Sequence, residues 1–361
     1  MNCYIHIPFC RNKCGYCAFY SISGAGEGVI DDYLSGLERS LVNCKNTEAV
    51  STLYFGGGTP TLLSEKQLHR LFNAVEKLDL TADCEISMEA NPETISAGKI
   101  NVIKSFVNRL SCGVQSFSAQ QRKILGRDCS DAALYTALDL IENAGFAHWN
   151  MDLIYAVPGQ SCADWEKELN KAVGFAADHV SCYNLTREEG ARLSGLHPVA
   201  DEAALQMWYL AEAVLSTAGI KRYEISNYAV PGAECRHNIN VWRGGKLLAF
   251  GPSASGFDGV DRYSWASDLR SFLDGTAPEM DVISRDRRLD EIFAVNLRTV
   301  FGWTAELWGQ VPQADDWTVR LNKAAGLQNE YGKELVEFSD ERISLTSDGL
   351  LFWNSIAESL L

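Results

Sequence analysis

The chain has 361 residues and a formal net charge of −15, with 46% hydrophobic and 22% charged residues. This length fits one large α/β domain with a smaller appendage, and the composition is ordinary for a globular protein. The acidic balance disfavours duplex nucleic acid or an anionic membrane as the main partner, because both attract basic surfaces.

The N-terminus does not resemble a secretory signal, because a histidine, a proline and cysteines interrupt it. No run of about 18 apolar residues predicts a membrane span. The eleven cysteines are an odd number and mostly lack regular spacing, which indicates reduced thiols instead of disulfides. We therefore expect a cytoplasmic monomer or homodimer that binds no nucleic acid and touches membranes at most peripherally.

Strand-like and helical segments alternate along residues 1–226. The expected strands are 3–7, 51–55, 85–90, 109–114, 149–155, 179–185 and 222–225. The expected helices are 65–78, 96–106, 132–144, 163–175 and 201–219, with Ser64 as the N-cap of the first and Gly145 following the third. Repeated βα units predict parallel strands with crossover helices. Six or seven strands fall short of a closed barrel, so the predicted fold is α/β, an open, partial (β/α)6-type barrel.

The pattern changes after residue 226. Residues 227–285 are rich in Gly, Arg, Asn, Ser and Asp with interleaved aromatic residues, and helical spacing resumes near Arg287. A β pair over 336–338 and 342–345, followed by a helix, predicts a small α+β, winged-helix-like domain with few basic residues. The expected division is 1–226, 227–285 and 286–361.

Three cysteines, Cys10, Cys14 and Cys17, follow the first strand at a C-x3-C-x2-C spacing, after Pro8 stops that strand. Thiolates at this spacing can surround one inorganic centre, and a set of three leaves one iron of a cubane cluster without a protein ligand. The alternatives are zinc with His6 as a fourth ligand, or plain buried thiols.

The run Gly56-Gly57-Gly58-Thr59-Pro60 joins a strand to a helix. Absent side chains let a ligand approach the backbone closely, although most glycine-rich turns are only turns. The run is neither a dinucleotide fingerprint nor a phosphate-binding loop.

Polar residues stand within strands, near strand ends or in the loops beyond them: Glu89, Gln115, Arg127 and Asp152. In parallel α/β folds the chemistry lies at the carboxyl ends of the strands. The two acids can accept hydrogen bonds from hydroxyls or an amine, whereas Gln115 and Arg127 can hold a carboxylate. Surface caps and ion pairs are the alternative for each residue taken singly.

Together these motifs, with Glu89-Ala90-Asn91-Pro92-Glu93, Gly113-Val114-Gln115-Ser116-Phe117 and Asn150-Met151-Asp152-Leu153-Ile154-Tyr155, resemble the radical S-adenosylmethionine superfamily, and within it the oxygen-independent coproporphyrinogen III oxidase branch. The resemblance implies that the three cysteines bind a [4Fe–4S] cluster whose open iron is chelated by the amine and carboxylate of S-adenosylmethionine. It also implies that this cofactor is contacted by Tyr4, Tyr16, Gly57, Gly58, Thr59, Glu89, Gln115, Arg127 and Asp152.

Within this branch the oxidases carry an N-terminal extension and a further cysteine two residues after the third. Here the chain starts nine residues before Cys10 and has Phe19 at that position. Both differences favour the HemW-like haem chaperones, which carry a His-Asn-x-x-Tyr-Trp signature. His237, Asn238 and Trp242 match this signature, and Val241 replaces the tyrosine.

As a haem site, this stretch would use His237 as an iron ligand, with Trp242 against the macrocycle and Arg236 or Arg243 on the propionates. Cys235 is a second candidate ligand. The alternative is that His237 and Asn238 cap a turn and Trp242 fills the core. We expect structural roles for the remaining histidines, which are His69, His148, His179 and His197.

The leading hypothesis is a haem chaperone that binds haem, a [4Fe–4S] cluster and S-adenosylmethionine and delivers haem to apo-haem proteins, served by an electron donor. The alternative is the coproporphyrinogen III oxidase of porphyrin biosynthesis. No catalytic residue is assigned, so whether the chain is an enzyme stays open. A nucleic-acid-modifying radical enzyme is disfavoured by the charge of −15.

Overall fold

The main sheet is organised around β1 (Asn2–Ile7), in which Cys3, Ile5 and Ile7 are fully buried. The computed structural model describes residues 1–186, 193 and 199–361. Both neighbours of β1 run parallel to it, which explains its near-continuous burial, because parallel sheets are covered on both faces.

Within these described ranges the sheet has twelve strands in the order β14-β13-β12-β11-β1-β4-β5-β6-β7-β8-β10-β9. The parallel strands that follow β1 in the chain are β4 (Val50–Gly57), β5 (Leu80–Ala90), β6 (Arg109–Gln115), β7 (His148–Tyr155) and β8 (His179–Asn184). The order runs from edge to edge without returning, so the predicted open, partial barrel is confirmed.

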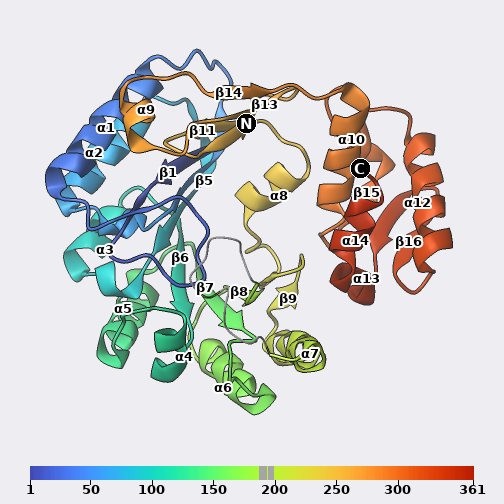
Figure 1. Cartoon of the computed structure of the whole chain (residues 1–361), viewed down its shortest axis with the longest axis horizontal. Helices are drawn as coiled ribbons and strands as arrows, with labels where there is room; N and C mark the ends of the chain where they lie inside the picture. Colours follow the sequence, from blue (N-terminus) through green and yellow to red (C-terminus); the bar gives the residue numbers. More distant parts are fainter. Residues whose placement is uncertain (187–192, 194–198) are drawn as a thin grey trace.

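Crossover helices follow the strands and cover the outer face of the curved sheet (Figure 1). They are α1 (Glu27–Val42), α2 (Glu65–Val75), α3 (Ala97–Lys104), α4 (Ala119–Ile124), α5 (Asp131–Ala144), α6 (Cys162–Val173) and α7 (Asp201–Thr217). Ser64 caps α2 with a reciprocal bond to Gln67, and Gly145 ends α5 at a φ of 69°, both as predicted. Helix α1 was not expected from the sequence, since Gly26 gives it no side-chain cap.

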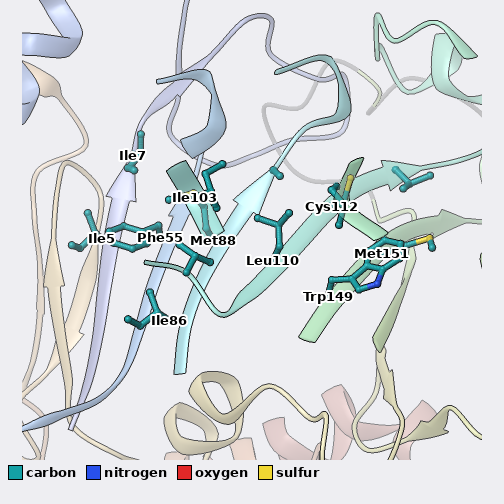
Figure 2. Close-up of a cluster of buried hydrophobic side chains, with 14 of the residues drawn as sticks. Ile5, Ile7, Phe55, Ile86, Met88, Ile103, Leu110, Cys112, Trp149 and Met151 are labelled. Carbon is teal, nitrogen blue, oxygen red and sulfur yellow. The ribbon is translucent and has the colours of Figure 1, made fainter. Parts of the chain in front are cut away.

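The core lies between the sheet and these helices. Side chains of neighbouring strands, such as Phe55, Met88, Leu110 and Met151, point into one continuous apolar layer (Figure 2).

Two strand assignments differ from expectation. The predicted seventh strand, 222–225, is reduced to β9 (Lys221–Arg222), which runs antiparallel to β10 (Asn227–Ala229). Residues 223–225 leave the sheet because Glu224 is fully buried as a hydrogen-bond acceptor for Ser226, Asn227 and Arg298. The seventh parallel strand is instead β11 (Leu247–Phe250), which pairs with β1.

Residues 227–285 extend the same sheet. They contribute β12 (Ser255–Phe257), β13 (Arg262–Ser264), β14 (Glu279–Asp281), α8 (Arg236–Trp242) and α9 (Leu269–Leu273). Helix α8 lies on the inner side of the curved sheet, opposite the crossover helices (Figure 1). It packs against β1 and β4.

The C-terminal part has its own apolar core around Phe293, Trp303 and Trp308. It consists of α10 (Arg285–Asn296), β15 (Trp303–Thr304), α11 (Ala305–Gly309), α12 (Trp317–Tyr331), β16 (Val336–Phe338), β17 (Arg342–Leu345), α13 (Ser347–Leu351) and α14 (Trp353–Glu358). The predicted strand pair is the antiparallel pair β16 and β17, so a small α+β unit is present. The domain boundaries at 226 and 285 stay a prediction.

None of the helices in the described ranges is both long enough and apolar enough to cross a bilayer.

Candidate functional site

A cavity of about 870 Å³ opens at the carboxyl ends of the parallel strands. Cys10, Cys14 and Cys17 line it together with residues of β4 to β8. The C-terminal unit supplies a further wall, which includes Trp353. The volume is at the upper end of that of small-molecule sites, so it has room for a cofactor and a second ligand.

The cysteine loop is held directly above the end of β4. After Pro8, the short strands β2 (Phe9–Cys10) and β3 (Ile22–Ser23) pair and frame the loop. Thr59 Oγ1 lies 3.7 Å from Cys10 Sγ. Burial raises the pKa of the Cys10 and Cys17 thiols, so a bound metal centre must displace their protons.

His6 is not available as a fourth metal ligand. Its Nδ1 lies 3.1 Å from the Tyr4 hydroxyl and its Nε2 lies 2.9 Å from the Tyr20 carbonyl oxygen. Both ring nitrogens are therefore engaged in the fold, which removes the zinc arrangement considered from the sequence. Among the described residues, moreover, no three His, Cys, Asp or Glu side chains converge closely enough to hold a single metal ion.

The glycine run passes tightly beneath the cysteine loop. A Cβ at Gly58 would lie 2.6 Å from the Phe9 carbonyl oxygen, and Gly57 has a φ of 109°. Only glycine fits both positions. The Gly57 N–H donates to Glu89 Oε2 at 3.0 Å, which ties the run to the end of β5.

Glu89 and Asp152 face the same cavity from β5 and β7. Glu89 also accepts a bond from the Tyr54 hydroxyl at 3.2 Å, and Asp152 accepts bonds from Ser111 at 3.0 Å and Asn150 at 2.8 Å. Burial and the neighbouring Asp152 raise the pKa of Glu89 to about 7, and burial raises that of Asp152. A cation placed between these two acids would relieve the cost of their burial.

Gln115 and Arg127 form the adjoining wall. Gln115 has a φ of 65°, and the Arg127 guanidinium donates to Asn91 Oδ1 and lies 3.8 Å from Glu93. Arg127 Nε is buried and lacks a hydrogen-bond partner among the described residues. An acceptor such as a carboxylate would satisfy it.

The cavity thus unites most of the predicted cofactor residues. These are Tyr16, Gly57, Gly58, Thr59, Glu89, Gln115, Arg127 and Asp152. Tyr4 instead lies behind Gly56, where its ring stacks on Tyr54 at 6.1 Å. Residues that were not expected from the sequence also line the cavity: Asn91, Arg109, Ser111, Asn150, His179, Tyr183, Trp208, Arg298, Leu350 and Trp353. Ser111, Asn150 and His179 stand on predicted strands, whereas Trp208, Arg298 and Trp353 give no local signal of reaching the site.

The three residues of the predicted haem signature do not share one cavity. Asn238 and Cys235 line the large cavity, whereas Trp242 and Val241 line a second one of about 460 Å³ between α8, β11 to β13 and α10. His237 is buried, with Nδ1 2.9 Å from Thr52 Oγ1, and burial lowers its pKa to about 3.

Of the other histidines, His69 is exposed, and His148 and His179 are hydrogen-bonded to Asp178 and Asn150. His197 lies outside the described residues.

Comparison with known proteins adds the family. Residues 4–172 match the model of the Radical SAM superfamily. The chain is 38% identical to the heme chaperone HemW of Escherichia coli K12, covering 71% of this chain and 70% of that protein. It is 32% identical to the heme chaperone HemW of Lactococcus lactis over 100% of this chain and 97% of that protein.

The chain belongs to the HemW family of radical SAM proteins. Among solved structures, that of coproporphyrinogen III oxidase (HemN) from Escherichia coli, a radical SAM enzyme, superposes with a TM-score of 0.87 at 23% identity. The match covers 99% of this chain and 89% of that one, and it shows the shared fold.

Membership of the radical SAM superfamily brings a [4Fe–4S] cluster and S-adenosylmethionine as cofactors. The HemW-family site described above fits both. Three thiols line one cavity, the glycine run leaves no side chain beneath them, and Arg127 Nε stands buried without an acceptor among the described residues. Two buried acids supply acceptors for the cationic cofactor.

Proposed function

We propose that this chain is a haem chaperone, which binds haem, a [4Fe–4S] cluster and S-adenosylmethionine and delivers haem to apo-haem proteins. The observation that carries the proposal is the full-length match to the Lactococcus lactis heme chaperone, at 32% identity over 100% of this chain. That match includes residues 227–361 as well as the barrel.

The cluster and cofactor would be held by the strand-end residues. Cys10, Cys14 and Cys17 would ligate three irons, and the amine and carboxylate of S-adenosylmethionine would chelate the remaining iron when both groups are bound. Glu89 and Asp152 would accept hydrogen bonds from its amine and ribose hydroxyls. The remaining contacts would come from Tyr16, Gly57, Gly58, Thr59, Gln115 and Arg127, with Tyr4 supporting the glycine run from behind.

The haem site is proposed around α8. Asn238 and Cys235 already face the large cavity, and Trp242 faces the smaller one. His237 would become an iron ligand only if α8 moves, because its ring is buried outside both cavities and Nδ1 is bonded to Thr52. A ligand that moves with α8 could bind and then release haem. Such release suits a haem carrier better than a protein that keeps its haem permanently.

The rival function is oxidative decarboxylation of coproporphyrinogen III. The fold shared with HemN is compatible with it, but the position two residues after the third cysteine favours the carrier. Phe19 occupies that position, lines the cavity and leaves 68% of its surface exposed, so no fourth thiol is supplied there. Further parts of the proposal are a cytoplasmic location, an electron donor and a monomeric or dimeric state.

The decisive test begins with the cluster-reconstituted chain loaded with haem. Mixing it with an apo-haem protein such as apomyoglobin should move the Soret band to that of the acceptor faster than haem is exchanged from serum albumin. His237→Ala should weaken haem binding, while His69→Ala, at an exposed histidine, should not.

The same preparation should be incubated with coproporphyrinogen III, S-adenosylmethionine and a reductant. Decarboxylated product would reject the chaperone in favour of the oxidase. A chain that neither binds nor transfers haem would reject it as well.

A further inference from the structure

The loop that follows β6 starts from a strained turn. Gln115 has a φ of 65°, which residues with a side chain rarely adopt, and the Ser116 N–H donates to the Val114 carbonyl at 2.8 Å. This is the spacing of a γ-turn in its rare form with a positive central φ. The register of β6 against β7 also shifts between Gly113 and Gln115. The turn aims Gln115 into the large cavity.

A strained turn persists only when its surroundings hold it. Glu168, on α6, supplies that hold: it accepts a bond from the Ser116 hydroxyl at 3.0 Å and another from the Phe117 N–H at 2.5 Å. The Glu168 side chain is buried beside Trp165 and Leu169, which form the apolar face of α6. Burying an acid on this face is costly unless its oxygens are hydrogen-bonded, and here the turn supplies the donors.

The same turn is held by a second buried charge. Arg122, which is 1% exposed, donates to the Ser116 carbonyl at 2.9 Å and to the Cys129 carbonyl at 3.1 Å. The Arg127 N–H in turn donates to the Arg122 carbonyl at 2.8 Å. The hydrogen bonds thus run from Glu168 through Ser116 and Arg122 to Arg127, the other polar residue of this cavity wall.

We propose that Glu168 is a positioning residue for S-adenosylmethionine, which fixes Gln115, and through Arg122 also Arg127, in the arrangement that receives the cofactor's carboxylate. Glu168 does not line the cavity and touches no ligand itself. This inference rests on the cofactor site proposed above.

Three variants separate positioning from general stability. Glu168→Ala removes both acceptor oxygens, and Glu168→Gln keeps one carbonyl oxygen for the Phe117 N–H. Leu169→Ala is the matched control, since Leu169 is the next residue of α6, is fully buried in the apolar core and has no polar side-chain atom that could bond to the turn. Its lost packing lowers the melting temperature without releasing the turn.

Two readouts are needed. The first is the Kd of S-adenosylmethionine, measured by equilibrium dialysis on the cluster-reconstituted chain. The second is hydrogen exchange of the Ser116 and Phe117 amides in the cofactor-free chain. We expect Glu168→Ala to raise the Kd at least about ten-fold, equivalent to about 1.4 kcal/mol, and to speed exchange at both amides. Glu168→Gln should fall between Glu168→Ala and wild type, and Leu169→Ala should keep the wild-type Kd.

Unchanged Kd in Glu168→Ala, or an equal rise in Leu169→Ala, would overturn the positioning role. If Glu168→Ala does not fold, Glu168→Gln decides by the same criteria. If the wild-type chain fails to bind S-adenosylmethionine, the proposed cofactor site is wrong. In that case hydrogen exchange alone tests whether Glu168 holds the turn. Unchanged exchange in Glu168→Ala would overturn this role.

Discussion

At the scale of single residues, the two acids in the large cavity have different hydrogen-bond partners. Asp152 accepts bonds from neutral side chains that include Ser111 and Asn150, whereas Glu89 accepts one from the Gly57 backbone and one from Tyr54. The pKa of Glu89 rises to about 7, because burial and the nearby Asp152 both disfavour its charge. In the cofactor-free chain Glu89 therefore titrates near neutral pH, and a bound cation would favour its ionised form.

The raised pKa of Glu89 predicts how the stability of the chain changes with pH. An acid whose folded pKa lies above its unfolded value of 4.5 makes folding less favourable as pH rises from about 4.5 to about 7. Glu89→Gln should therefore be close to wild type in stability at pH 4.5 and more stable above pH 7, by at most about 3 kcal/mol.

Urea unfolding of the cofactor-free chain at several pH values measures this difference. Glu76→Gln, which removes an exposed carboxylate of α2's C-cap, is the control for the substitution itself. A Glu89→Gln variant whose stability relative to wild type is the same at pH 4.5 and pH 8 would contradict the raised pKa.

Site residues can be predicted from the sequence where they lie at the end of a recognisable strand. Glu89, Gln115 and Asp152 were found in this way, because their strands are recognisable in the sequence and parallel strands end at the same edge of the sheet. Glu168 gave no such signal: it lies 53 residues from Gln115 in the sequence and resembles an ordinary polar residue of an amphipathic helix. His237 shows the opposite case, because its residue type predicts a ligand while its present contacts are structural.

At the scale of elements, α8 lies on the inner side of the barrel and packs against β1 and β4 (Figure 1). Its first residues are held by one acid: Glu85 accepts the N–H groups of Arg236 at 3.0 Å and His237 at 2.9 Å, and Cys235 Sγ lies 3.6 Å away. At the far end, Asn240 bonds to Asn2 at 3.2 Å. The helix is therefore anchored at both ends to strands of the main sheet.

Loss of the anchor at Glu85 should free the helix. Glu85→Gln retains a single acceptor oxygen, which leaves a buried N–H unpaired and should cost about 1–3 kcal/mol of stability. Hydrogen exchange over 235–242 should rise selectively. The control is Asp83→Asn, because its pair with Arg236 is exposed and screened by solvent, so its loss should leave the stability close to that of the wild type. Equal effects of both variants would show that Glu85 is not the anchor.

Hydrophobic periodicity predicted the regular helices and strands. It failed where contacts between distant parts of the chain determine the local structure. Strands β4 to β8 were found because their apolar runs are bounded by glycine, proline or asparagine. Strand β11 was missed because it has four residues, and its partner β1 lies about 245 residues away. The opposite error at 222–225 arose because polar and apolar residues alternate there as in a strand, whereas Tyr223 and Glu224 bond to His179 and Arg298.

At the scale of the whole molecule, one arginine joins the two cores. Arg298, just after α10, lies 2.8 Å from the fully buried Glu224 of the barrel. Its guanidinium also stacks between Trp242 of α8, at 4.7 Å, and Trp353 of α14, at 5.2 Å. The wall that the C-terminal unit gives to the large cavity therefore depends on this contact.

Arg298→Met should loosen the two cores from each other. It leaves Glu224 buried without its cation, which should cost about 3 kcal/mol. Calorimetry should show a lower melting temperature, with the C-terminal unit unfolding earlier than the barrel. Arg262→Met removes ion pairs with Asp281 and Glu291, but the Arg262 side chain is partly exposed, so this control should cost less stability than Arg298→Met. A single unshifted transition in Arg298→Met would contradict this role.

The position of β1 between β4 and β11 also concerns the newly made chain. Asn2 pairs with Thr52 on one side and with Leu247 on the other. At about 5–20 residues per second, a ribosome needs on the order of 10–50 s to add the missing neighbour. Throughout that time the strand that carries the cysteine loop is bordered on one edge only. Its thiols are thus made well before that strand gains its second neighbour, and we expect cluster insertion to follow this pairing.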